Sequence, residues 1–120
     1  MKIRIRGNSI RYRLDKKDIQ TLQEQQKVEE ATTIGAGALH FCIKAKASGP
    51  AIKLEQTAIH LSVPADQIKT WIETEQVGIS LELPNPDGSV LNILIEKDFK
   101  CLTEREEDDS QAFENPLKSC

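Results

Sequence analysis

The chain opens with Met1-Lys2-Ile3-Arg4-Ile5-Arg6-Gly7-Asn8-Ser9-Ile10-Arg11-Tyr12-Arg13-Leu14, in which apolar and basic side chains alternate. Alternation of this kind has the period of a half-buried β-strand, so one face enters a core and the other carries positive charge. The apolar phase changes around Gly7-Asn8-Ser9, which requires either a tight hairpin turn or a bulge within one long strand. In a hairpin, we expect Arg4 to pair with Arg13 and Arg6 with Arg11.

Like charges directly opposite each other destabilise a sheet unless a negative group lies over them. We therefore expect an anion near the predicted anion-binding residues, which are Arg4, Arg6, Arg11 and Arg13. One source of negative charge is the chain's own acidic run, Glu104 to Asp109, folded back across the arginines. The other source is an external phosphate, nucleic acid or acidic peptide. The residues alone leave both sources open.

Length and composition limit the architecture and the partners. A chain of 120 residues is one domain by the usual size range, and we predict this domain over residues 1–109, with 110–120 as a tail. A net charge of -3 argues against general affinity for nucleic acid, which stays possible but is not favoured. No apolar stretch has the length of a signal peptide or a membrane span, so we predict no membrane association and a cytoplasmic location. The odd count of three cysteines does not indicate a disulfide framework.

Periodicity in the first half predicts a helix followed by two strands. Asp15 and Asp18 cap a helix with a thin apolar stripe, which we expect to end before a loop at residues 32–37. Residues 38–47 and 51–63 alternate as strands, the second with a bulge near Gln56. Because the turn at residues 48–50 is too short for a crossover, these two strands are expected to be antiparallel neighbours.

The second half predicts a helix and a hairpin. Pro64 opens a helix whose buried stripe holds Ile68, Trp71 and Ile72. A long-looped hairpin follows, and its return strand, Val90 to Ile95, is expected to be central and covered on both faces. A short helix is expected over about residues 98–108, with Phe99 turned inward. The predicted fold is a single α+β domain with a mainly antiparallel sheet and two or three helices packed on one face.

Candidate chemistry is sparse. His40, Cys42 and His60 lie on polar strand faces, where they could share a zinc ion with Cys101, or where a histidine could activate Cys42 as a nucleophile. The paired spacing of a structural zinc site and the elbow of a nucleophile are both missing from the sequence, so we predict no catalytic set, no metal and no cofactor. Other candidates for acid–base or thiol chemistry are Glu96, Asp98 and Cys101.

Over nearly its whole length, the chain resembles a small family of uncharacterised bacterial proteins. The resemblance is carried by the opening Lys2-Ile3-Arg4-Ile5-Arg6-Gly7-Asn8-Ser9-Ile10-Arg11, by Gln76-Val77-Gly78-Ile79 and by Ile95-Glu96-Lys97-Asp98-Phe99-Lys100-Cys101-Leu102. That family has no assigned activity, so the resemblance implies a single bacterial domain and nothing about mechanism. It marks the basic strand and residues 96–115 as places to test.

A second, local resemblance concerns Arg6-Gly7-Asn8-Ser9 and the basic strand after it. This segment is similar to the start of swapped-hairpin DNA-binding antitoxins and transition-state regulators, which form intertwined dimers and contact DNA through their basic face. The resemblance implies DNA contacts from Arg4, Arg6, Asn8, Arg11 and Arg13. The chain departs from those proteins at Leu14-Asp15, where they carry a hydrophobic residue and proline.

Together these features predict a non-enzymatic cytoplasmic binding or interaction domain. Its basic amino-terminal strand is expected to engage an anionic ligand, a protein partner or the chain's own acidic segment. The alternative is a small hydrolase or transferase acting on a phosphate-bearing substrate, which leaves open whether the protein is an enzyme. A dimeric DNA-binding protein is the third possibility. The sequence does not specify the oligomeric state.

Overall fold

The structure, a computed structural model, describes residues 1–99. In chain order, its elements are β1 (Lys2–Arg6), β2 (Ser9–Leu14), α1 (Lys16–Gln25), β3 (Lys27–Ile34), β4 (Gly37–Lys46), β5 (Ala51–Glu55), β6 (Ala58–Pro64), α2 (Ala65–Glu73), β7 (Gly78–Pro84) and β8 (Val90–Lys97). The predicted α+β class is confirmed, with strand pairing that is mostly antiparallel and two helices in the described residues.

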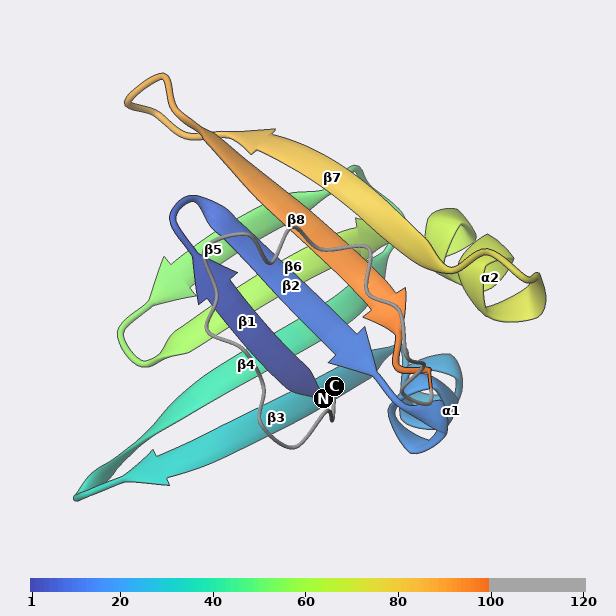
Figure 1. The fold of residues 1–120 in the computed structure, drawn as a ribbon, viewed down its shortest axis with the longest axis horizontal. Helices are drawn as coiled ribbons and strands as arrows, with labels where there is room; N and C mark the ends of the chain where they lie inside the picture. Colours follow the sequence, from blue (N-terminus) through green and yellow to red (C-terminus); the bar gives the residue numbers. More distant parts are fainter. Residues whose placement is uncertain (100–120) are drawn as a thin grey trace, which may run out of the picture.

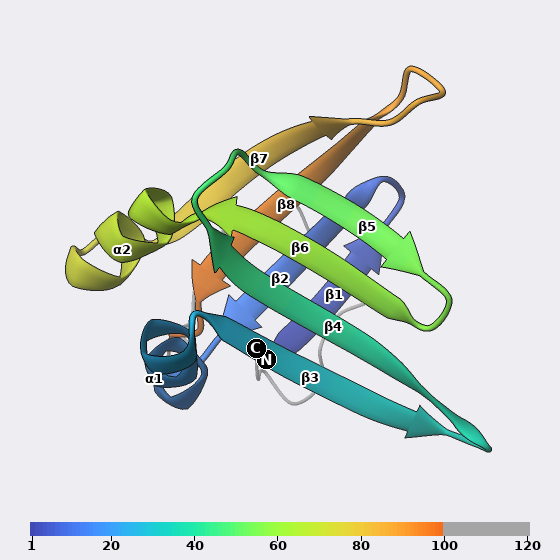
Figure 2. The same cartoon turned by 180° about the vertical axis from the view of Figure 1, so that it is seen from behind.

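The strands form two four-stranded sheets that face each other. Sheet A has the order β1-β2-β8-β7, and sheet B has the order β3-β4-β6-β5. The two inner strands of each sheet, β2 with β8 and β4 with β6, run parallel, and every other pair is antiparallel. Sheet A lies in front of sheet B in Figure 1 and behind it in Figure 2. Their facing sides enclose the core.

Both helices lie at the same end of the two sheets, on the right of Figure 1. Helix α1 begins with the predicted cap, because the Asp15 side chain accepts from the Asp18 N–H at 2.9 Å and the Asp18 carboxylate accepts from the Asp15 N–H at 3.1 Å. Leu22 from α1, and Ile68 and Trp71 from α2, are buried against the sheets. Within residues 1–99, neither helix has the length and apolar character that crossing a bilayer requires.

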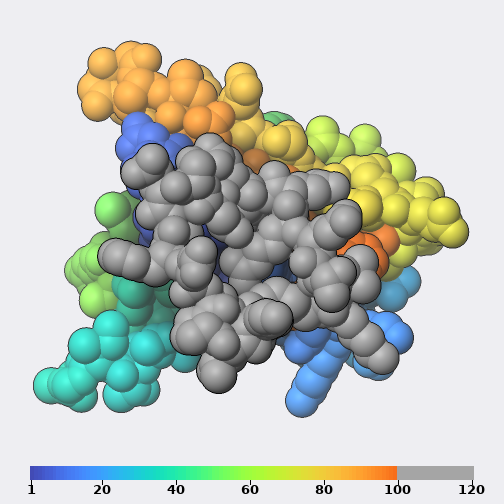
Figure 3. All heavy atoms as spheres, in the orientation of Figure 1, coloured from blue at the N-terminus to red at the C-terminus, as the bar shows by residue number. Residues whose placement is uncertain are grey.

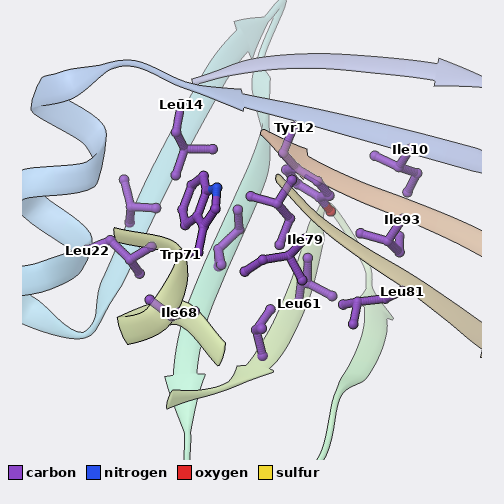
Figure 4. Close-up of a cluster of buried hydrophobic side chains, with 14 of the residues drawn as sticks. Ile10, Tyr12, Leu14, Leu22, Leu61, Ile68, Trp71, Ile79, Leu81 and Ile93 are labelled. Carbon is purple, nitrogen blue, oxygen red and sulfur yellow. The ribbon is translucent and has the colours of Figure 1, made fainter. Parts of the chain in front are cut away.

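The core is one cluster fed by both sheets and both helices (Figure 4). Trp71 is fully buried, and its indole N–H donates to the Val77 carbonyl oxygen at 3.0 Å, as a core tryptophan with its polar end at an edge should do. Tyr12 is also fully buried, yet its hydroxyl has no hydrogen-bond partner among the described residues.

The two halves of the described chain share one architecture. The first half, β1–β2–α1–β3–β4, and the second half, β5–β6–α2–β7–β8, each consist of two hairpins joined by a helix. The hairpins are exchanged between the sheets, since β1–β2 pairs with β7–β8 in sheet A, and β3–β4 pairs with β5–β6 in sheet B. The fold is therefore an internal duplication with approximate two-fold symmetry.

Backbone contacts and sequence both follow this duplication. The Asn92 N–H donates to the Asn8 carbonyl at 2.9 Å, and the His40 N–H donates to the Thr57 carbonyl at 2.8 Å, which are equivalent bonds in the two sheets. Core positions on β2 and α1 recur 49 positions later on β6 and α2, namely Ile10, Tyr12, Leu14, Ile19 and Leu22 at Ile59, Leu61, Val63, Ile68 and Trp71.

Three expectations for the first half of the chain are wrong. Residues 27–34 form strand β3, where the end of a helix and the start of a loop were expected. The sequence did not predict this strand because it has no apolar alternation, and Val28 is its one buried residue. The second correction concerns β4 and β5, which are not neighbours. Strand β6 lies between them, parallel to β4 and antiparallel to β5. The expected bulge near Gln56 is the turn of the β5–β6 hairpin, and Gln56 has a φ of 46°.

Only some of the predictions for the carboxyl-terminal part of the chain concern residues that the structure describes. Strand β8 is central, as predicted, with Ile93 and Ile95 buried on its inner face and Leu94 half-buried on its outer face. The side chain of Phe99 is 61% exposed, so the expectation that it turns inward is wrong. The rest of the expected helix near residue 108 lies outside the described residues.

Candidate anion-binding face

The amino-terminal segment is a hairpin and not one bulged strand. Its two-residue turn is Gly7-Asn8, where Gly7 adopts a φ of 53° that suits glycine. The register places Arg4 opposite Arg11, Lys2 opposite Arg13 and Arg6 opposite Ser9. The expected pairings of Arg4 with Arg13 and of Arg6 with Arg11 are wrong by two residues, because they require a four-residue loop over residues 7–10 and the turn has only two residues.

Five cations share the outer side of this hairpin, and we call this surface the basic face. It is formed by Lys2, Arg4, Arg6, Arg11 and Arg13. Alternation fixes their direction, since Ile10, Tyr12 and Leu14 from the same hairpin are buried in the core. Four of the five cations are the arginines predicted as anion-binding residues. The structure therefore places these arginines together on one surface.

Carboxylates from β8 and its end meet the basic face. The Glu96 Oε1 atom lies 2.7 Å from the Arg13 Nε atom and 3.4 Å from the Arg11 Nε atom. The Asp98 carboxylate lies 2.9 Å from the Lys2 ammonium group. Parallel pairing of β2 with β8 brings Arg13 directly beside Glu96, so the register of the sheet determines this contact.

The candidates for acid–base chemistry thus have structural partners. Glu96 bridges two arginines, and Asp98 contacts a lysine. The third candidate, Cys101, lies outside the described residues, as does the acidic run Glu104 to Asp109. What the described residues show is a surface that already holds carboxylates between its cations.

A groove runs beside the basic face, between β1 at the edge of sheet A and β3 at the edge of sheet B. It has a volume of about 400 Å³ and is lined by Met1, Ile3, Ile5, Glu30, Thr32, Leu39 and Phe41. We call it the edge groove. The α-amino group of Met1 lies 2.8 Å from the Asp18 carboxylate and 3.7 Å from the Glu30 carboxylate, near one end of the groove.

The outer side of sheet B holds the histidine and cysteine candidates. Cys42 is buried and lies beside His60 in the parallel β4–β6 pair, while His40 is exposed. Burial and the neighbouring Glu29 carboxylate raise the pKa of the Cys42 thiol. A nucleophilic cysteine needs a lowered pKa, so this environment opposes activation. Within residues 1–99, no three histidine, cysteine, aspartate or glutamate side chains are placed to share a metal ion.

Figure 3 shows two parts of the chain that project from the rest of the surface. The β7–β8 loop and the β3–β4 hairpin extend as separate lobes, at the top and at the lower left of the view. In Figure 2, the tip of the β3–β4 hairpin reaches past the strands of sheet A.

Sequence reasoning missed the edge groove because strand β3 was not expected. The signal that could have revealed it is the internal repeat of 49 residues between the β2–α1 and β6–α2 segments. A hairpin follows the second helix in the predicted second half, so recognition of the repeat would have placed a hairpin after the first helix as well.

Comparison with known protein families gives a match over almost the whole chain. The model of a family of unknown function, DUF7009, matches residues 1–117. No curated protein and no solved structure matches the chain.

Proposed function

Because the chain belongs to the DUF7009 family, which has no assigned function, we propose its role from the site: a non-enzymatic binding domain whose basic face engages an acidic protein segment. The carrying observation is that the β1–β2 hairpin gathers five cations on one surface, with Glu96 held between two of them. The setting that we propose is the bacterial cytoplasm.

A carboxylate partner is favoured by the spacing of the arginines. Arg11 and Arg13 lie two residues apart on β2, so their side chains share a face and one carboxylate reaches both. Guanidinium groups bind carboxylates through charge-assisted hydrogen bonds, which are the stronger kind. Arg4, beside Arg11, and Arg6, at the turn, continue the same surface and would meet further carboxylates of a partner in the same way.

An acidic segment is favoured over nucleic acid by the charge of the whole chain. The net charge is -3, and non-specific binding to nucleic acid depends on the neutralisation of many phosphates. The basic face therefore acts as a local positive surface on an acidic protein. Such a surface selects partners by local complementarity and speeds their association at low salt.

The test is the binding of polyglutamate to the full-length protein, measured by calorimetry at low and moderate salt. We expect binding that weakens with salt, and a dissociation constant about fivefold higher in the variant Arg6→Ala, which removes one cation of the basic face. The matched control removes one cation from the outer side of sheet B, in Lys53→Ala, where the side chain is 72% exposed. This control should bind like the parent protein.

Two results would contradict the proposal. Equal loss of affinity in the Lys53→Ala control would show that only the total charge matters. Binding of short duplex DNA without binding of polyglutamate would favour the DNA-binding alternative. The chain's own acidic run is the competing occupant, and it is tested by neutralising Glu104, Glu106 and Glu107 together. If polyglutamate binds only to that variant, the basic face serves the chain's own segment.

A further inference from the structure

We propose that the partner of the basic face is an extended strand that adds to the edge of β1 facing away from β2, with acidic side chains over the basic face and apolar side chains in the edge groove. This inference rests on the proposed function and narrows the partner to one conformation and one residue pattern. It combines three features of the structure: an edge strand, a groove beside that strand and a charge pattern along it.

The first feature is the position of β1 in sheet A. Among the described residues, β1 pairs with β2 on one side, and its other side is an edge of the sheet. An edge strand presents backbone N–H and C=O groups that a further strand can bind. The side chain of Ile5, on the inner side of this edge, is 56% exposed. A strand added here would cover this exposed apolar side chain.

The second feature is the contrast between the two related edges of the molecule. Internal symmetry relates β3 to β7, so Glu30 and Thr32 correspond to Leu81 and Leu83. Both leucines are buried, at 9% and 8% exposure, whereas Glu30 and Thr32 are exposed. Leu81 and Leu83 thus cover the β7 side of this edge, although Leu54 of β5, the counterpart of Ile5, is 74% exposed. The equivalent edge between β1 and β3 is the one that carries the edge groove.

The groove lies where the inward side chains of an added strand would point. Neighbouring strands lie about 4.8 Å apart and successive side chains alternate between the two faces of a sheet. A strand beside β1 would therefore place every second side chain next to Ile3 and Ile5, above Leu39 and Phe41 of β4. Apolar side chains suit these neighbours, and Thr32 supplies a hydroxyl at the far wall.

The third feature is the positive charge along the outer side of β1, which determines the side chains that an added strand would carry on that side. The remaining side chains of an added strand would lie beside Lys2, Arg4 and Arg6 on the outer side of β1. Opposite charges on neighbouring strands stabilise a sheet and like charges destabilise it. A second copy of β1 would bring arginines against arginines, so self-pairing is disfavoured. A strand that alternates acidic and apolar residues satisfies both faces.

The experiment compares two peptides of the same composition and charge by fluorescence anisotropy with the full-length protein. One alternates glutamate and valine, and the other carries the glutamates and the valines in two separate blocks. We expect the alternating peptide to bind about tenfold more tightly, because only its pattern fits both the basic face and the groove.

Strand pairing is tested by N-methylation of the alternating peptide at every second backbone nitrogen. Since alternate N–H groups of a strand point to opposite sides, one methylated series should lose binding and the complementary series should keep it. A complex held by charge alone would treat the two series alike. That result would overturn the inference.

The groove is tested by Thr32→Trp, which places a large side chain in the groove, against Thr33→Trp on the opposite side of the same strand. Both threonines are exposed, so both variants should fold. We expect Thr32→Trp to weaken the alternating peptide several-fold and Thr33→Trp to leave it unchanged.

The outcomes separate this inference from the proposed function. Equal affinity for the alternating and block peptides, with polyglutamate still bound, would overturn strand addition and keep the basic face as a binding site. Failure of all acidic ligands would overturn both. If the alternating peptide binds only when Glu104, Glu106 and Glu107 are neutralised, the site belongs to the chain's own segment and the inference is wrong.

Discussion

Arg13 and Glu96, which are 83 positions apart in the sequence, lie side by side on the parallel strands β2 and β8, with 2.7 Å between Nε and Oε1. This pair joins the first hairpin of the chain to the last described strand. It also places a carboxylate inside the basic face, where Glu96 is 17% exposed. The pair therefore links β2 to β8 and also lowers the positive charge of the basic face.

The variant Glu96→Gln should separate these two roles. We expect a loss of stability of about 1 kcal/mol, which shrinks at high salt because the pair is partly exposed. Polyglutamate should bind about two- to fivefold more tightly, since the basic face loses a negative charge. Thermal unfolding followed by the fluorescence of the single tryptophan, Trp71, and calorimetry give the two readouts.

The control for this variant is Glu82→Gln, which removes the same charge from the outer side of β7, two strands away from β2. This change should alter the melting temperature and the affinity for polyglutamate only slightly. Weaker binding of polyglutamate by Glu96→Gln would contradict the proposed role of the basic face. An enzyme that used Glu96 would instead lose turnover in this variant while it kept its fold.

Tyr12 should titrate far above a free tyrosine. Burial, with the nearby Cys42 as a second cause, raises the pKa of Tyr12 from 10.0 to about 12. Because burial disfavours the phenolate, the stability of the fold does not depend on this group below pH 10 and falls as the pH rises from 10 through 12. Tyr12 is the only tyrosine, so phenolate absorbance reports on it alone. A midpoint near 10 in the folded protein would contradict its burial.

The variant Tyr12→Phe should be at least as stable as the parent protein. The Tyr12 hydroxyl is buried without a hydrogen-bond partner among the described residues, and an unsatisfied buried polar group costs about 1–3 kcal/mol. Removal of the hydroxyl keeps the ring and its packing. Chemical denaturation should therefore show an unchanged or higher free energy of unfolding. The control Tyr12→Leu, which copies the related position Leu61, should destabilise by about 2 kcal/mol through the cavity it leaves.

The variant Gly78→Ala should be destabilised although Gly78 has an ordinary backbone conformation. A Cβ atom at this position would lie 2.8 Å from the Ile95 carbonyl oxygen, so strand β7 would have to move away from β8. We expect a cost of about 1–3 kcal/mol, seen as a melting temperature lower by several degrees. Gly49→Ala is the matched control, because nothing lies within 4 Å of its added Cβ atom. Equal melting temperatures of the two variants would show that the close approach is not rigid.

Local sequence patterns predicted those features of the fold that depend on residues close together in the chain. The alternation around Arg4 and Arg11 predicted a half-buried strand segment with a basic face, and the cap at Asp15 predicted the start of α1. The spacing of Ile68 and Trp71 predicted the buried side of α2. In each case the residues that determine the structure lie within a few positions of one another.

Pairing between distant strands was not predictable from these signals. The parallel contact of β4 with β6 arises because β5 lies at the edge of sheet B, with β6 between it and β4. The short turn at residues 48–50 suggested instead that β4 and β5 form a simple hairpin. Strand β3 buries Val28 alone, so its place in the sheet comes from backbone pairing with β4 and not from apolar alternation. The edge groove depends on both features.

The exchange of hairpins between the two halves also determines the order in which the molecule can assemble. Strands β1 and β2 leave the ribosome first, but their inner partner β8 is made some 80 residues later, so sheet A cannot close during most of synthesis. Contacts between residues so distant in the chain are slow to form. Charged side chains along an edge strand oppose pairing with further copies, so the arginines of the first hairpin would limit its self-association until β8 arrives.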